Sequence, residues 1–117
     1  FMRLLTVHGR RTGTARTTPV VPVLDGGTWV VSPFGEVGWV HNARATGRVE
    51  LQRGGEHATF EARELDPQEA VPVLRRYLAL PARFFVRRYV DVTARSSDDE
   101  IAAEAPRHPV FELTPVR

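Results

Sequence analysis

The stretch TTPVVPVLDGGTWVVS, residues 17–32, holds two apolar runs on either side of an Asp-Gly-Gly sequence. The Asp-Gly pair accepts the positive φ angles that a tight hairpin turn requires, so the runs at 17–24 and 28–32 are expected to pair as antiparallel strands. Two prolines interrupt the first run. Because proline has no N–H to donate to a neighbouring strand, residues 17–24 are predicted to form an edge or bulged strand.

Further strands are expected on both sides of this hairpin. An apolar run at 4–7 precedes it in the chain. Alternating apolar and polar residues at 49–52 and 58–62 flank a Gly-Gly turn and predict a second hairpin. Residues 108–116 are expected to close the fold as a last strand.

Helix signals lie between these strands and after them. A helix is expected over residues 39–46, followed by Gly47 as a typical C-cap. A second helix is expected to begin at Asp66-Pro67-Gln68-Glu69, which supplies an N-cap, a first-turn proline and the acid of a capping box. The remaining signals are Pro81, which ends that helix or starts another through residues 85–92, and Ser97 with Glu100, which cap a last short helix.

Length and element order favour one mainly β (α+β) domain over residues 1–117. A chain of 117 residues with 42% hydrophobic and 26% charged residues is sufficient for one core. Alternating βαβ units are missing, which excludes a doubly wound parallel sheet. About six short antiparallel strands that must avoid open edges favour a small barrel.

The loop from His8 to Arg16 concentrates groups that bind anions. Two glycines bracket two arginines and a threonine, and a third arginine follows. Glycine permits the backbone turn that points successive N–H groups at one anion, and arginine adds charge-assisted donors. A solvated basic turn is the alternative interpretation of the same residues.

A second group of residues follows the first hairpin. Ser32-Pro33-Phe34-Gly35 is a bent loop, and Trp39 and Asn42 share one face of the helix expected after it. An aromatic plane with an amide beside a bent loop can hold a flat heterocycle. The alternative is a core tryptophan with Asn42 as a local cap.

Taken together, these residues resemble the deazaflavin-dependent nitroreductase family, actinobacterial oxidoreductases that use coenzyme F420. The likeness extends from about Leu4 to Leu65, and a weaker similarity is present in the helical region and at residues 108–111. Its motifs are Gly9-Arg10-Arg11-Thr12-Gly13, Arg16, Pro19, the Gly-Gly hairpin turn, Ser32-Pro33-Phe34-Gly35, Trp39-x-x-Asn42 and Arg44-Ala45.

The resemblance implies a split β-barrel, similar to FMN-binding proteins, with peripheral helices. It also implies a basic loop that holds the cofactor phosphate and a second loop along the deazaflavin ring. The cofactor-binding residues that it implies are Arg10, Arg11, Thr12, Gly13, Arg16, Ser32, Pro33, Phe34, Gly35, Trp39 and Asn42.

The function implied is hydride transfer from reduced coenzyme F420 to a small electrophile, namely a quinone, an enone or a nitro compound. Ser32 is the first candidate to hydrogen-bond the ring or the substrate, and Tyr89 is the candidate proton donor. Tyr77 is the weaker alternative, since its helical spacing places it with core residues. The loop after Ser32 is shorter than in nitroimidazole-activating relatives, so a different substrate pocket is expected.

Several other functions are weighed against this one. FMN could occupy the same barrel, or the protein could carry the cofactor without catalysis. No metal site is expected, because the chain has no cysteine and its four histidines lack metal-ligand spacing. Nucleic acid is not an expected partner, because the arginines are scattered among acids rather than interleaved with aromatics.

The expected partners are therefore a small-molecule substrate and, by analogy with other split barrels, a second copy of the chain. No stretch is apolar and long enough for stable membrane insertion. We expect a cytoplasmic protein, which would be peripheral at a membrane only if an N-terminal helical segment like that of its relatives preceded this sequence.

Overall fold

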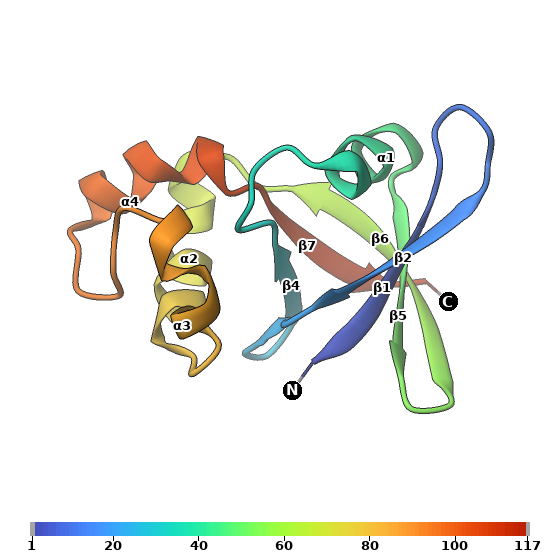
Figure 1. The fold of residues 1–117 in the computed structure, drawn as a ribbon, viewed down its shortest axis with the longest axis horizontal. Helices are drawn as coiled ribbons and strands as arrows, with labels where there is room; N and C mark the ends of the chain where they lie inside the picture. The colour runs from blue at the N-terminus through green and yellow to red at the C-terminus, as the bar shows by residue number, and fades with distance from the viewer. Residues whose placement is uncertain (1, 117) are drawn as a thin grey trace.

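The computed structural model describes residues 2–116, so Phe1 and Arg117 of the predicted 1–117 domain lie outside the described residues. Seven strands and four α-helices, with two short 3-10 helices (η), make up the fold (Figure 1). The strands are β1 Arg3–His8, β2 Ala15–Val20, β3 Val23–Leu24, β4 Thr28–Val31, β5 Arg48–Arg53, β6 Glu56–Glu64 and β7 Val110–Pro115. The helices are α1 Gly38–Thr46, α2 Pro67–Ala79, α3 Arg83–Val86, η1 Arg87–Tyr89, α4 Asp98–Glu104 and η2 Ala105–Arg107.

The strands form one curled antiparallel sheet in the order β2-β1-β5-β6-β7-β4-β3, a half-barrel of the split-barrel type. Strands β2 and β3 follow each other in sequence but lie at opposite edges of this sheet. The chain can connect the two edges through Val21 and Pro22 only because the sheet curls.

The single strand predicted at 17–24 is therefore wrong in one respect. It divides into β2, which ends at Val20 and pairs with β1, and β3, which begins at Val23 and pairs with β4. Pro22 lies between them, and its missing N–H favours a break in strand pairing at this point. The predicted edge position is confirmed for both pieces.

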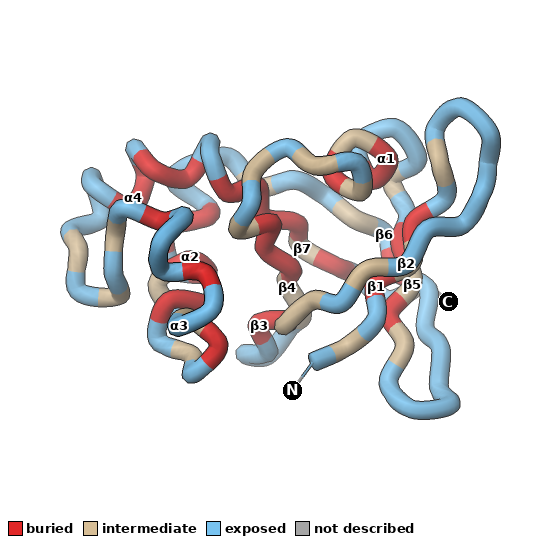
Figure 2. The backbone as a smooth tube through the Cα atoms, in the orientation of Figure 1, coloured by how far each residue is buried: buried red, intermediate tan, exposed pale blue. Residues whose placement is uncertain are grey.

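Two hydrophobic cores share the strands β4 and β7. Successive residues of a strand point to opposite faces, so Val30 and Phe111 enter the barrel core while Val31 and Val110 enter the core under the helices. Figure 2 shows buried residues along both strands. The helices α2 and α4 supply most of the second core: α2 packs against β4, and α4 packs against α2 (Figure 1). Helix α1 covers the barrel near β1 and β6.

The local helix signals are mostly confirmed. Asp66 with Glu69, and Ser97 with Glu100, each form a complete capping box, and Gly47 is the left-handed C-cap of α1. The helix considered at 85–92 is wrong: α3 is one turn long and continues only as the 3-10 turn η1. None of the helices within residues 2–116 is long and apolar enough to cross a lipid bilayer.

Candidate functional site

A cavity of about 870 Å³ opens along the split of the barrel. Strand β2 forms one wall, the end of β4 and the loop Ser32–Phe34 form another, and α2 and α3 contribute the third. Most of the side chains that line it are apolar. Within residues 2–116, Arg16 is the only charged residue in the lining, and it stands where β2 leaves the basic loop.

The loop that follows β4 is fixed by its own hydrogen bonds. The Ser32 side chain is buried, and its hydroxyl donates to the carbonyl oxygen of Gly35 at 2.6 Å. The Ser32 N–H donates to the carbonyl of Pro109 at 2.8 Å. Gly35 has a φ of +91°, which explains why a glycine is required there. The hydroxyl proton of Ser32 is thus already engaged, and what remains free for a ligand is the acceptor capacity of its oxygen.

The basic loop is closed by backbone contacts between Gly9 and the residues that follow it. Gly9 N–H donates to Thr14 O at 2.8 Å, and Gly13 N–H donates to Gly9 O at 2.9 Å. Gly13 takes the expected positive φ, at +73°, whereas Gly9 does not. The amides of Gly9, Arg10, Gly13 and Thr14 all have acceptors inside the protein. Anion binding by this loop therefore depends on its guanidinium groups more than on the amide nest considered from the sequence.

Asn42 anchors that loop to α1. Its Oδ1 accepts from the backbone N–H of Arg10 at 3.1 Å and from the Arg10 guanidinium at 2.8 Å. Asn42 is 4% exposed and does not line the cavity. The sequence grouped Asn42 with Trp39 around the ring pocket, but the two side chains diverge: Trp39 lines the cavity and packs on Phe111, with ring centroids 5.6 Å apart.

The arginines of the loop keep their charges available. None of the ion pairs found within residues 2–116 involves Arg10, Arg11 or Arg16. Guanidinium groups without a carboxylate partner favour a phosphate or carboxylate ligand. The cavity and this charged loop meet at Arg16, so together they suit a molecule with an apolar flat part and an anionic tail.

The two tyrosines differ in their relation to the cavity. Tyr77 of α2 lines it and is 6% exposed, and burial raises the pKa of its hydroxyl, which stays protonated at neutral pH. No hydrogen bond joins that hydroxyl to another of the described residues. Tyr89 is 52% exposed and is not in the lining, but its ring meets Phe34 edge to face at 4.9 Å. The predicted role of Tyr89 therefore requires that its side chain move toward the cavity.

Several wall residues were not identified from the sequence. Thr17 and Thr18 on β2, and Phe85 and Val86 on α3, line the cavity. The spacing of Ala82, Phe85 and Val86 at three and four residues was the available signal, since it places these side chains on one helix face. Nothing in the sequence indicated that this face would lie opposite β2.

The chain resembles one protein family and several solved structures. The family described as F420H2-dependent quinone reductase matches residues 2–101. No curated protein matches the chain. The solved structures include an F420-H2-dependent reductase (FDR-A), 22% identical with a TM-score of 0.62, for which 96% of this chain and 92% of that chain are covered.

Two further structures share the fold. One, described as a domain-swapped dimer, is 21% identical with a TM-score of 0.64 and coverage of 96% of this chain and 78% of that chain. The heme storage protein HutZ from Vibrio cholerae is 11% identical with a TM-score of 0.62 and coverage of 99% and 82%. At these identities the likeness shows the split-barrel fold.

Proposed function

This chain belongs to the family of F420H2-dependent quinone reductases, and we propose that it reduces a flat, largely apolar acceptor in the cavity beside β2. The protein is an oxidoreductase, and its cofactor is F420. The acceptor classes proposed are quinones, enones and nitro compounds. The observation that carries the proposal is the continuity between the apolar cavity and the unpaired arginines, which meet at Arg16.

The residues present fit the cofactor. A deazaflavin is a flat heterocycle with an anionic tail, and the cavity offers apolar walls for the ring and Arg16 for the start of the tail. Arg10 and Arg11 extend the same positive charge along the loop. Because the described lining contains no carboxylate, nothing in it repels a phosphate or a glutamate tail.

When bound, reduced F420 supplies a hydride to the acceptor, which takes up a further proton to complete a two-electron reduction. The protein contributes positioning, removal of water and a hydrogen-bond donor. The apolar walls, Trp39 among them, would hold the ring and displace water from it. The Tyr77 hydroxyl is protonated and has no hydrogen-bond partner among residues 2–116, so it can donate to the oxygen on which negative charge develops. Tyr89 remains a second candidate, if its ring leaves Phe34.

The direct test is to mix purified protein with reduced F420 and a panel of quinones, enones and nitroaromatics, and to follow cofactor oxidation. Oxidation that needs both protein and acceptor supports the proposal. Tight cofactor binding with no turnover on any acceptor would favour a carrier. Preferential binding of FMN over F420, read from the absorption and fluorescence of the bound species, would favour a flavin enzyme instead.

A homodimer stays a prediction for this chain. One structural relative is described as a domain-swapped dimer, and β2 has one edge that is not paired within the sheet. Light scattering at several protein concentrations measures the molar mass directly, and the mass of a monomer at all of them would contradict a dimer.

A further inference from the structure

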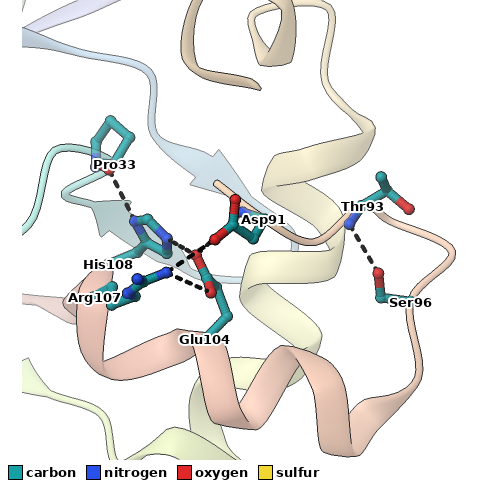
Figure 3. A network of polar contacts seen from close by, with 7 residues as sticks. All are labelled: Pro33, Asp91, Thr93, Ser96, Glu104, Arg107 and His108. Atoms are coloured by element: carbon teal, nitrogen blue, oxygen red, sulfur yellow. Dashed lines mark hydrogen bonds and ion pairs between the residues drawn. The ribbon is translucent and has the colours of Figure 1, made fainter. Parts of the chain in front are cut away.

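Two buried ionisable side chains lie behind the loop that borders the cavity. His108, between η2 and β7, is 3% exposed, and Glu104, at the end of α4, is 7% exposed. The imidazole Nε2 lies 2.7 Å from Glu104 Oε2, and Nδ1 lies 2.8 Å from the carbonyl oxygen of Pro33. Figure 3 shows the imidazole between these two acceptors.

This geometry sets the number of protons on the imidazole. A carbonyl oxygen and a carboxylate are both acceptors, so each ring nitrogen needs a proton. Burial by itself raises the pKa of Glu104, but the hydrogen bonds from His108 and from the Asp91 N–H, with the charges of His108 and Arg107, outweigh burial and hold that pKa below its usual value. In this arrangement a doubly protonated imidazole satisfies both acceptors, one of which is the Glu104 carboxylate.

The pair connects two segments that are far apart in sequence. Pro33 belongs to the loop along the cavity, 75 residues from His108. Glu104 Oε2 also accepts from the backbone N–H of Asp91 at 3.2 Å, two residues after Tyr89. Phe34 and Tyr89, whose rings touch, lie on the same two segments. The pair thus holds together the backbones that carry this aromatic contact.

Charged groups approach the imidazole from each packed element. They are Glu104 from α4, Arg107 from η2 and Asp91 from the segment after η1. Arg107, whose side chain is largely exposed, contacts Asp91 at 3.1 Å and Glu104 at 3.3 Å through its Nη1 (Figure 3). The cavity loop contributes the Pro33 carbonyl, so the contact between this loop and the pair depends on the Nδ1 proton.

We propose that His108 and Glu104 act as a positioning clamp, which holds the Ser32–Gly35 loop against the Tyr89 segment while the imidazole carries two protons. A neutral imidazole has one N–H and can satisfy only one of its two acceptors. This inference rests on the proposed function, because the loop that it holds is the one assigned to the cofactor ring.

Two substitutions test the two hydrogen bonds of His108 separately. In His108→Asn the amide nitrogen takes the place of Nδ1 and can still donate to Pro33, whereas in His108→Gln it takes the place of Nε2 and reaches only Glu104. We expect His108→Gln to raise the KM for reduced F420 by about tenfold, the loss of one hydrogen bond, and His108→Asn to raise it less. His57→Asn and His57→Gln, in the exposed β5–β6 hairpin, are the controls.

Glu104→Gln tests the role of the protons. A neutral amide oxygen still accepts hydrogen bonds but no longer stabilises a positive charge on the imidazole, so the alkaline limb of the kcat/KM profile should move to lower pH. A purely structural pair would change the melting temperature without moving this limb. An alkaline limb that is unchanged in Glu104→Gln, or equal KM values in the two His108 variants, would overturn the clamp. If both His108 variants fail to fold, the Glu104→Gln profile decides alone.

A measurement that does not depend on catalysis distinguishes failure of the clamp from failure of the proposed function. In an NMR titration of the unmodified protein, the backbone amides of Phe34 and Gly35 should shift with the same midpoint as the His108 imidazole, and this shift should vanish in His108→Gln. Independent midpoints would refute the clamp even in an active enzyme. Conversely, absence of turnover on every acceptor, with the coupled titration present, would refute the proposed function and leave the clamp standing.

Discussion

Asn42 and Arg10 are 32 residues apart in sequence, yet one side-chain oxygen of Asn42 accepts from both the backbone N–H and the guanidinium of Arg10. The contact joins Asn42, a buried polar residue of α1, to the loop that carries Arg11 and Arg16. It fixes the loop at its base and leaves Arg11 at the tip and Arg16 at the cavity for a ligand. The position of the charged groups thus depends on an amide that a ligand need not touch.

Replacing Asn42 by alanine should weaken F420 binding. The substitution leaves the Arg10 N–H without its acceptor and frees the base of the loop, at a cost of about 1–3 kcal/mol in binding or folding free energy. Calorimetry of F420 binding and a thermal melt separate the two effects. Asn42→Asp is the control: it keeps the acceptor but adds a negative charge, so it should preserve the fold and still weaken anion binding. Unchanged affinity in Asn42→Ala would contradict the anchoring role.

Removing one arginine of the basic loop should weaken cofactor binding without unfolding the protein. For Arg11→Ala and for Arg16→Ala we expect a loss of about 1.5–3 kcal/mol, the range for a hydrogen bond to a charged group. The loss should shrink as salt is added, because salt screens the exposed charges. Arg48→Ala, at an exposed position on β5, provides a matched loss of charge elsewhere. An equal effect at Arg48 would mean that net charge, and no specific contact, attracts the cofactor.

Tyr77→Phe and Tyr89→Phe distinguish the two candidate proton donors. Because Tyr77 lines the cavity and Tyr89 does not, we expect Tyr77→Phe to lower kcat by about a hundredfold to a thousandfold, the effect of one lost oxyanion donor, with little change in cofactor affinity. Tyr89→Phe should leave kcat within about twofold, since the ring contact with Phe34 is kept. If Tyr89→Phe lowers kcat more than Tyr77→Phe does, Tyr89 is the proton donor.

Acid should remove the stability that Glu104 contributes. The folded-state pKa of Glu104 is lowered, so its contribution is present above its unfolded value of about 4.3 and is lost as pH falls through the lower folded value. The melting temperature of the unmodified protein should therefore exceed that of Glu104→Gln at pH 5 to 7, and the gap should narrow toward pH 3. If the difference in melting temperature between the two proteins stays constant with pH, the charge of the Glu104 carboxylate does not contribute to stability.

Local signals in the sequence were sufficient for many elements of this fold. The capping boxes at Asp66 and Ser97 and the left-handed cap at Gly47 formed as expected. In each of these places the deciding interaction joins residues at most four positions apart. The alternation of residues 49–52 and 58–62 similarly predicted the β5–β6 hairpin, because a short turn makes strand partners of sequence neighbours.

Long-range geometry decided the features that the sequence misjudged or omitted. The run at 17–24 looked continuous, and only the curl of the sheet places β2 and β3 at opposite edges. Tyr77 has the helical spacing of a core residue and is buried, yet one side of it borders the cavity, because α2 packs beside the split of the barrel. His108 could not be paired with Pro33 from any local pattern.

The sequence by itself determined most of the strands, the helix caps, the basic loop and a resemblance to F420-dependent reductases, since all of these depend on residue type and short spacing. The tertiary structure alone decided that Asn42 serves the basic loop, that Arg16 joins this loop to the cavity, and that a buried imidazole links Glu104 to Pro33. The physical reason is that hydrogen bonds and cavity walls depend on distances in space, and the fold brings together residues that are 32 and 75 positions apart in the chain.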